Sequence, residues 1–227
     1  MSGAIGIDLE QFGKQIGKAV NQKKTILFFL GAGCSWPAIP LARDIVNKLR
    51  RETEGESPLS SYEQLNYEHD VTRLVDTDSD RQEHFSSLCK NVKPTRPQTE
   101  FAKLIDALQK NEQVPVILTT NFDLLLERAL GMAGIDRDVC DLDGDKLADL
   151  QSMLKMAKND GRPLVVNLLG SVKGGRAVHF NMQNGGEVGK ALAAILPATT
   201  RVVVAGYSGA ESGVADMFST LFFGDRA

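Results

Sequence analysis

Two groups of residues in this 227-residue chain have the types and spacing that chemistry requires, and each follows the pattern of a buried strand. The first group is Gly31-Ala32-Gly33-Cys34-Ser35, which comes directly after the apolar run Thr25 to Leu30. Glycines at such a turn let backbone N–H groups approach a phosphate, and a helix that begins beyond the turn, here after Pro40, adds the positive end of its dipole. The pattern predicts a nucleotide site, although close packing of the turn favours the same glycines.

The second group is Thr120-Asn121-Phe122-Asp123, which follows the apolar run Val114 to Thr119. Polar side chains at the carboxyl end of a parallel strand lie where open α/β sheets bind their ligands. Thr, Asn and Asp are also the residues preferred at helix N-caps, so capping of the following helix explains part of the pattern. The two roles are compatible.

Two further apolar runs, Leu164 to Leu168 and Arg201 to Ala205, bring the number of predicted strands to four. Helical spacing of apolar residues separates them. The predicted helices cover residues 5–20, 41–51, 61–75, 80–91, 97–110, 124–132, 146–158, 187–196 and a segment after 211. This alternation predicts an α/β fold with a Rossmann-like, mainly parallel sheet and helices on both faces.

The length suits a single domain over residues 1–227. Residues 52–111 are charged and contain no convincing strand, so we expect a helical insertion there that caps the nucleotide side. The amphipathic first helix should cover one face of the sheet, and it could also face a second copy of the chain.

Composition excludes several classes of function. The 26 basic and 29 acidic residues give a net charge of −3, which does not favour nucleic acid or an anionic membrane. No apolar run reaches about 18 residues and no signal peptide is evident, so we expect a soluble, cytoplasmic protein.

No metal site is expected either. The cysteines, Cys34, Cys89 and Cys140, are far apart, which suggests neither a disulfide framework nor the paired cysteines of a zinc site. The alternating acids Asp76-Asp78-Asp80 lack the glycine hinge and distal glutamate of a calcium loop, so a solvated turn is the better interpretation.

Four strings in this chain resemble, in order, the motifs of the sirtuin-like NAD-binding family over about residues 25 to 222. They are GAGxS followed by Ile39-Pro40, TTNxDxxxE from Thr119, Gly170-Ser171, and Gly206-Tyr207-Ser208. The resemblance implies that Asn121 contacts the nicotinamide ribose and is required for NAD+ cleavage. It also implies a cofactor-binding set: Gly31, Ala32, Gly33, Ser35, Thr120, Asn121, Asp123, Gly170, Ser171, Gly206 and Ser208.

The chain departs from the family at its catalytic histidine. The family string is close to KLHGS, whereas this chain has Leu169 at the histidine position. A leucine can neither transfer a proton nor hydrogen-bond a ribose hydroxyl. His179 follows in a short β-like stretch and is the alternative source of an imidazole, while Glu211 replaces the aspartate of the closing GYSxxD motif.

Because the chain lacks the paired cysteines of a zinc site, it resembles the zinc-free branch of the family. Members of that branch degrade NAD+ and often serve as N-terminal effectors of bacterial anti-phage proteins. The resemblance implies hydrolysis of NAD+ to nicotinamide and ADP-ribose, at a rate that Leu169 weakens. We expect further C-terminal sensor or regulatory modules or a partner protein, and we expect self-association through the amphipathic helices. The alternative is an inactive NAD+ or ADP-ribose-binding sensor or assembly module. Protein deacylation is disfavoured because the zinc module is missing.

Overall fold

The computed structural model describes residues 9–224 apart from 56, 61–64, 66, 76, 143–146, 173–181, 183 and 210–211. His179, Glu211 and Asp76 therefore lie outside the described residues. The described part of the chain contains a five-stranded sheet in the order β3-β4-β2-β1-β5, and every neighbouring pair of strands is parallel. The strands are β1 (Ile26–Leu30), β2 (Val116–Thr119), β3 (Asp138–Asp141), β4 (Leu164–Asn167) and β5 (Arg201–Ala205). The predicted α/β, Rossmann-like fold is confirmed.

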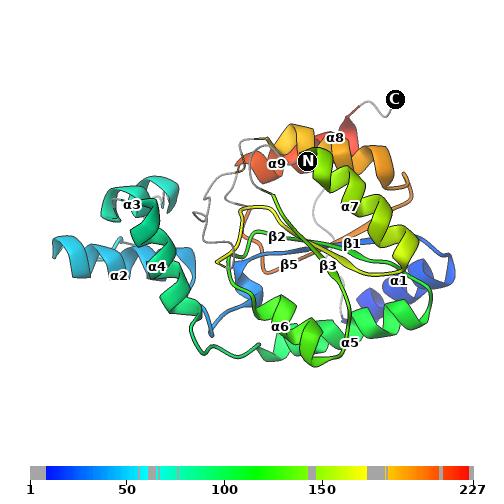
Figure 1. The fold of residues 1–227 in the computed structure, drawn as a ribbon, viewed down its shortest axis with the longest axis horizontal. Helices are drawn as coiled ribbons and strands as arrows, with labels where there is room; N and C mark the ends of the chain where they lie inside the picture. The colour runs from blue at the N-terminus through cyan, green and yellow to red at the C-terminus, as the bar shows by residue number, and fades with distance from the viewer. Residues whose placement is uncertain are drawn as a thin grey trace.

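Helices cover both faces of this sheet (Figure 1). One face, here called the α5 face, packs against α1 (Leu9–Asn21), α5 (Arg96–Lys110) and α6 (Leu125–Met132). The other, called the α7 face, packs against α7 (Leu147–Asp160), α8 (Gly185–Ile195) and α9 (Ser212–Phe223). Alternation along the strands supplies both cores: in β1, Leu27 and Phe29 belong to the α7 core, whereas Ile26 and Phe28 belong to the α5 core.

The chain path explains why all the strands end at one edge of the sheet. The connections from β1 to β2 to β3 use helices of the α5 face, and the connections from β3 to β4 to β5 return through helices of the α7 face. Right-handed crossovers require this change of face when the direction across the sheet reverses. At the carboxyl edge, Asp141, Asn167, Thr119, Leu30 and Ala205 lie in one register row.

Next to this carboxyl edge lies a small helical lobe (Figure 1). It consists of α2 (Ala42–Leu49), the π-helical turn η2 (Arg50–Glu54), α3 (Tyr67–Leu74) and α4 (Asp78–Cys89), which share an apolar cluster of their own. The predicted insertion 52–111 thus divides between two places. Its last helix, α5, buries Ala102, Ile105 and Leu108 against the sheet instead of joining the lobe.

Strand β3 is the element that the sequence did not predict. Its four residues, Asp138 to Asp141, include only two apolar side chains and end in acids at both sides, so they show neither an apolar run nor a clear alternation. Pairing with β4 makes the segment a strand. Tertiary context overrides local preference here, as it often does at sheet edges.

Two kinds of feature are absent from the described residues. None of the helices in this part of the chain is long and apolar enough to cross a membrane. Within the same residues, no group of three or more His, Cys, Asp or Glu side chains is placed to hold a metal ion.

Candidate functional site

The glycine turn after β1 is in close contact with the turn after β5. A Cβ atom added at Gly31 would lie 2.6 Å from the carbonyl oxygen of Gly206, and one added at Gly206 would lie 2.6 Å from the amide nitrogen of Cys34. Gly206 also has a φ of +65°, which side chains other than glycine rarely adopt. Close packing therefore gives these glycines a structural reason that is independent of any ligand.

The backbone amides of this turn already donate to carbonyls of the fold. Gly31 N–H donates to Ala205 (2.9 Å), Gly33 N–H to Gly206 (2.8 Å) and Ser35 N–H to Ala32 (3.0 Å). The turn continues as a short 3₁₀ helix, Ala32–Cys34, and α2 begins only at Ala42, within the lobe. α2 thus begins after Pro40, as predicted, and not at the glycine turn itself. Pyrophosphate binding by Gly31 and Gly33 stays a prediction.

Ser35 is the centre of a buried hydrogen-bond network that joins three segments. Its hydroxyl donates to Asp123 Oδ2 (2.7 Å) and accepts from Gln98 Nε2 (2.9 Å) and Asn121 Nδ2 (3.0 Å). One donor and two acceptor sites exhaust what a hydroxyl offers. Ser35 is only 1% exposed, and its hydroxyl fixes the side chain of Asn121. Cofactor binding by Ser35 stays a prediction.

Asn121 is held at two points, and its side-chain oxygen is left without a partner among the described residues. Its backbone N–H donates to Thr119 Oγ1 (3.0 Å), while the Thr119 hydroxyl donates to the Leu30 carbonyl (2.9 Å). The side-chain nitrogen is bound to Ser35. The Oδ1 atom is buried and has no hydrogen-bond partner among the described residues. An unpaired buried acceptor costs about 1–3 kcal/mol, so this oxygen is suited to accept from a ligand hydroxyl or a water molecule.

Asp123 closes the network on the side of α6. Its Oδ1 accepts from the backbone N–H of Leu125 (2.9 Å), the first residue of α6, and its Oδ2 accepts from Ser35. The N-cap position itself is Leu124, which makes no side-chain capping bond, so the predicted capping of α6 by a Thr, Asn or Asp side chain at the N-cap is not found. Burial raises the pKa of Asp123, and the bonds from Ser35 and Leu125 act in the opposite direction. The carboxyl group therefore serves as a fixed anchor within the fold.

A second polar network occupies the carboxyl ends of β3 and β4. The Asn167 side chain donates through Nδ2 to Asp141 Oδ1 (2.7 Å) and to Glu127 Oε1 (3.2 Å). The Ser171 hydroxyl donates to Asp141 Oδ2 (3.3 Å). Asn167 is fully buried, and two of the network's acceptors, Asn167 Oδ1 and Glu127 Oε2, have no partner among the described residues.

The two networks meet through α6. Glu127 lies one helical turn after Asp123, and burial raises its pKa, with the Asp123 charge adding in the same direction. Glu127 is the last residue of the TTNxDxxxE motif, from which no role for it was predicted. Gln98, Asp141 and Asn167 were not predicted as site residues. Only Gln98 carried a local signal, because Thr95 and Gln98 have the spacing of a capping box, which the structure contains.

The remaining predicted residues differ in their placement. Leu169 is buried at 6% exposure within the apolar core of the α7 face. Gly170 lies in the same turn with a φ of +75°, and Ser171 belongs to the second network. The others do not enter either network: Ala32 and Ser208 are exposed, and Thr120 is half-buried with its amide directed to the Leu30 carbonyl.

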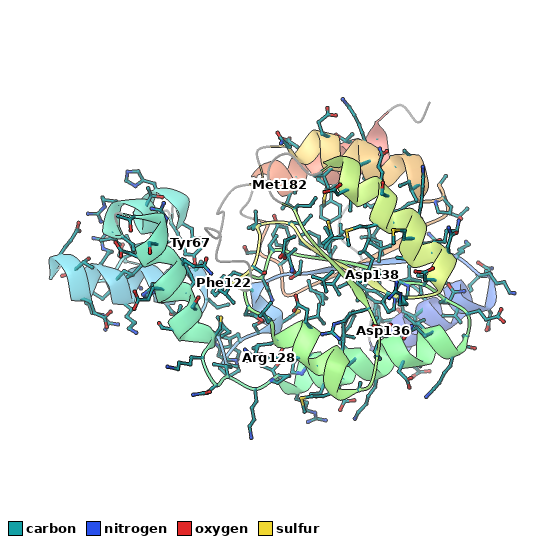
Figure 2. All side chains as sticks on the ribbon, viewed as in Figure 1. Tyr67, Phe122, Arg128, Asp136, Asp138 and Met182 are labelled. Carbon is teal, nitrogen blue, oxygen red and sulfur yellow. The ribbon has the colours of Figure 1, made fainter. Side chains whose placement is uncertain are left out.

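The lobe contacts both site loops. Phe122, between Asn121 and Asp123, lies where the lobe meets the sheet (Figure 2), and its ring packs against Phe85 of α4 at a centroid distance of 4.7 Å. Val172, which follows Ser171, donates its N–H to the Phe122 carbonyl (3.0 Å), and its own carbonyl accepts from Gln82 Nε2 (2.9 Å). The lobe therefore fixes the segments that carry Asn121 and Ser171.

Part of the chain matches a known protein family. Residues 115–222 match the family model described as a SIR2-like domain. The matched stretch begins beside β2 and includes both polar networks except for Ser35 and Gln98, while the glycine turn lies outside it. No curated protein matched the chain. The match covers slightly less than half of the chain, supports the sirtuin-like resemblance over this stretch and suggests an NAD-related function.

Proposed function

We propose that the carboxyl edge of the sheet binds NAD+ and hydrolyses it slowly to nicotinamide and ADP-ribose. The observation that carries this proposal is Asn121, whose amide is fixed by Ser35 while its Oδ1 atom stays without a partner among the described residues. A ribose hydroxyl would satisfy that oxygen. The SIR2-like match over residues 115–222 gives independent support for NAD+ as the ligand.

In the proposed reaction, the bond between the ribose C1′ and the nicotinamide nitrogen breaks, and nicotinamide leaves with the bonding electron pair. The leaving group carries a positive charge before it departs, so no acid is needed to expel it. Water then adds to C1′ and loses a proton, which gives ADP-ribose. Loss of a general base typically costs about 10²–10⁴ in rate, so the apolar Leu169 is consistent with slow hydrolysis.

The biological setting belongs to the same proposal. The sirtuin-like resemblance favours the zinc-free, NAD-degrading branch, and hence a cytoplasmic effector of bacterial anti-phage defence that self-associates and works with further modules or a partner. Its support is the resemblance alone.

The test is release of nicotinamide from NAD+ by wild-type protein, measured by chromatography over hours. We expect slow release, and we expect Asn121→Ala to reduce it by at least about 10²-fold, the usual effect of removing one preorganised hydrogen-bonding group. Asn21→Ala at the exposed end of α1 is the matched control and should keep the wild-type rate. Equal release by wild type and Asn121→Ala would contradict the proposed site.

A second candidate is a module that binds NAD+ or ADP-ribose without cleaving it. The buried, apolar Leu169 favours it, because the histidine position of the family offers no polar group here. Binding of NAD+ without release of nicotinamide would support this candidate over hydrolysis.

A further inference from the structure

We propose that Asp141 is the general base of this site and removes the proton from the water that adds to the ribose. The inference rests on the proposed hydrolysis and adds to it a residue that the family motifs do not identify. It answers the question that Leu169 raises, which is how the proton can leave without the histidine.

The position of Asp141 is the first argument. Asp141 pairs in register with Asn167, and Asn167 pairs with Thr119. Neighbouring strands lie about 4.8 Å apart, so about 10 Å separates the backbones of Asp141 and Thr119, and Asn121 follows two residues later. The turn that contains Leu169 comes from β4, the strand between them. Asp141 and Asn121 thus flank the turn at which the family carries its histidine.

The bonds made by Asp141 are the second argument. Ser171, two residues after Leu169 in the same turn, donates to Oδ2, and Asn167 donates to Oδ1. Both donors hold the carboxylate in a fixed orientation. Each carboxylate oxygen can accept two hydrogen bonds, so these contacts leave room for a water molecule.

Access is the third argument, and it separates Asp141 from the other two carboxyl groups of the networks. Asp123 is 4% exposed and Glu127 is 6% exposed, whereas Asp141 is half-buried. Among the described carboxyl groups of the two networks, Asp141 alone can receive a proton from a bound water and pass it to solvent.

In the step itself, an O–H bond of water breaks as its oxygen forms the bond to C1′. The Asp141 carboxylate takes the proton, nicotinamide has left with the electron pair of the broken C–N bond, and the proton then passes to solvent. The reaction consumes one NAD+ and one water and yields nicotinamide, ADP-ribose and one proton, so it needs no other reactant.

The experiment compares Asp141→Asn with Asp138→Asn. Asp138 belongs to the same strand but lies at its amino end, away from the lobe (Figure 2). Its Oδ1 atom is 3.3 Å from Arg162 Nη2. We expect Asp141→Asn to lower kcat by at least about 10²-fold with KM unchanged, and Asp138→Asn to keep the wild-type kcat. The asparagine retains an acceptor oxygen for the Asn167 amide, so the fold should persist.

Two further variants separate proton transfer from a structural role. Formate supplied to Asp141→Ala should restore part of the lost rate, since a free carboxylate can replace the missing base. Leu169→His should raise hydrolysis most in the Asp141→Asn protein, where it supplies the missing base, by up to roughly 10²–10⁴. In the Leu169→His protein, Asp141→Asn should cost much less than in the wild type, because the imidazole then provides a second base.

Hydrolysis by Asp141→Asn at the wild-type rate would overturn the role of Asp141 and leave the proposed function intact. Loss of rate without rescue by formate, and with the full loss repeated in Leu169→His, would also overturn it. Wild-type protein that binds NAD+ but releases no nicotinamide would overturn the hydrolysis and the general base together.

Discussion

Within the polar networks at the carboxyl edge, the surroundings of Glu127 disfavour its charged form. Its carboxyl group is buried, one oxygen has no partner among the described residues, and the Asp123 carboxyl lies one helical turn away. The neighbouring acceptor, Asn167 Oδ1, is unpaired as well. A charged carboxylate is therefore poorly accommodated, which is the physical reason why the pKa of Glu127 is raised.

This predicts that Glu127→Gln stabilises the protein at neutral and alkaline pH. The amide keeps the acceptor for Asn167 Nδ2 and adds a donor for Asn167 Oδ1, while the buried charge is removed. We expect a gain of about 1 kcal/mol in the free energy of unfolding at pH 8, measured by urea denaturation.

The sign of the pH dependence follows from the raised pKa. The folded state binds the Glu127 proton more tightly than the unfolded state, so wild-type stability falls as pH rises from the unfolded pKa through the folded one. The advantage of Glu127→Gln should thus shrink at pH values below the unfolded carboxyl pKa. Glu83→Gln, an exposed control on α4, should show no such trend, and an equal trend in both variants would contradict the account.

At the scale of elements, α5 links the sheet to the site. Thr95 caps this helix through a reciprocal capping box with Gln98, and its hydroxyl also donates to the Cys34 carbonyl (3.0 Å) in the glycine turn. Gln98 then reaches Ser35. The start of α5 thereby fixes the turn and the hydroxyl that holds Asn121.

Thr95→Ala should cost about 1–2 kcal/mol of stability, because both the cap and the bond to Cys34 are lost. Thr95→Ser, which retains the hydroxyl, should recover most of that free energy. Thr99→Ala is the control, since the Thr99 hydroxyl is bound only within α5, to the Arg96 carbonyl, and should cost much less. Thermal unfolding followed by circular dichroism measures all three. Equal losses for Thr95→Ala and Thr99→Ala would show that the cap does not support the turn.

At the scale of the whole molecule, sequence patterns predicted the layers of the fold but only part of the site. Four of the strands and the helices between them follow from apolar runs and helical periodicity, which are local signals. Strand β3 and the separation of α5 from the lobe depend on pairing and packing across the chain. Such contacts leave little trace in any one segment.

The same division holds for the site. Asn121 and Asp123 were predicted because they share a short motif, and the structure joins both to Ser35. Asp141 and Asn167 belong to strands far apart in the sequence, so only the sheet register brings them together. Gly31 and Gly206 show the opposite case. Their motifs predicted a cofactor-binding role, and the close packing of the two turns gives a structural reason for glycine at both positions as well.

The central claim is that Asn121 contributes to an NAD+ site at the carboxyl edge of the sheet. Titration calorimetry of NAD+ into wild-type protein and into Asn121→Ala tests it most directly. We expect one NAD+ site per chain in the wild type and an affinity about 3–10-fold weaker in Asn121→Ala, the effect of one hydrogen bond worth about 1 kcal/mol. Absence of binding to the folded wild type at millimolar NAD+, or equal affinity of the two proteins, would contradict it.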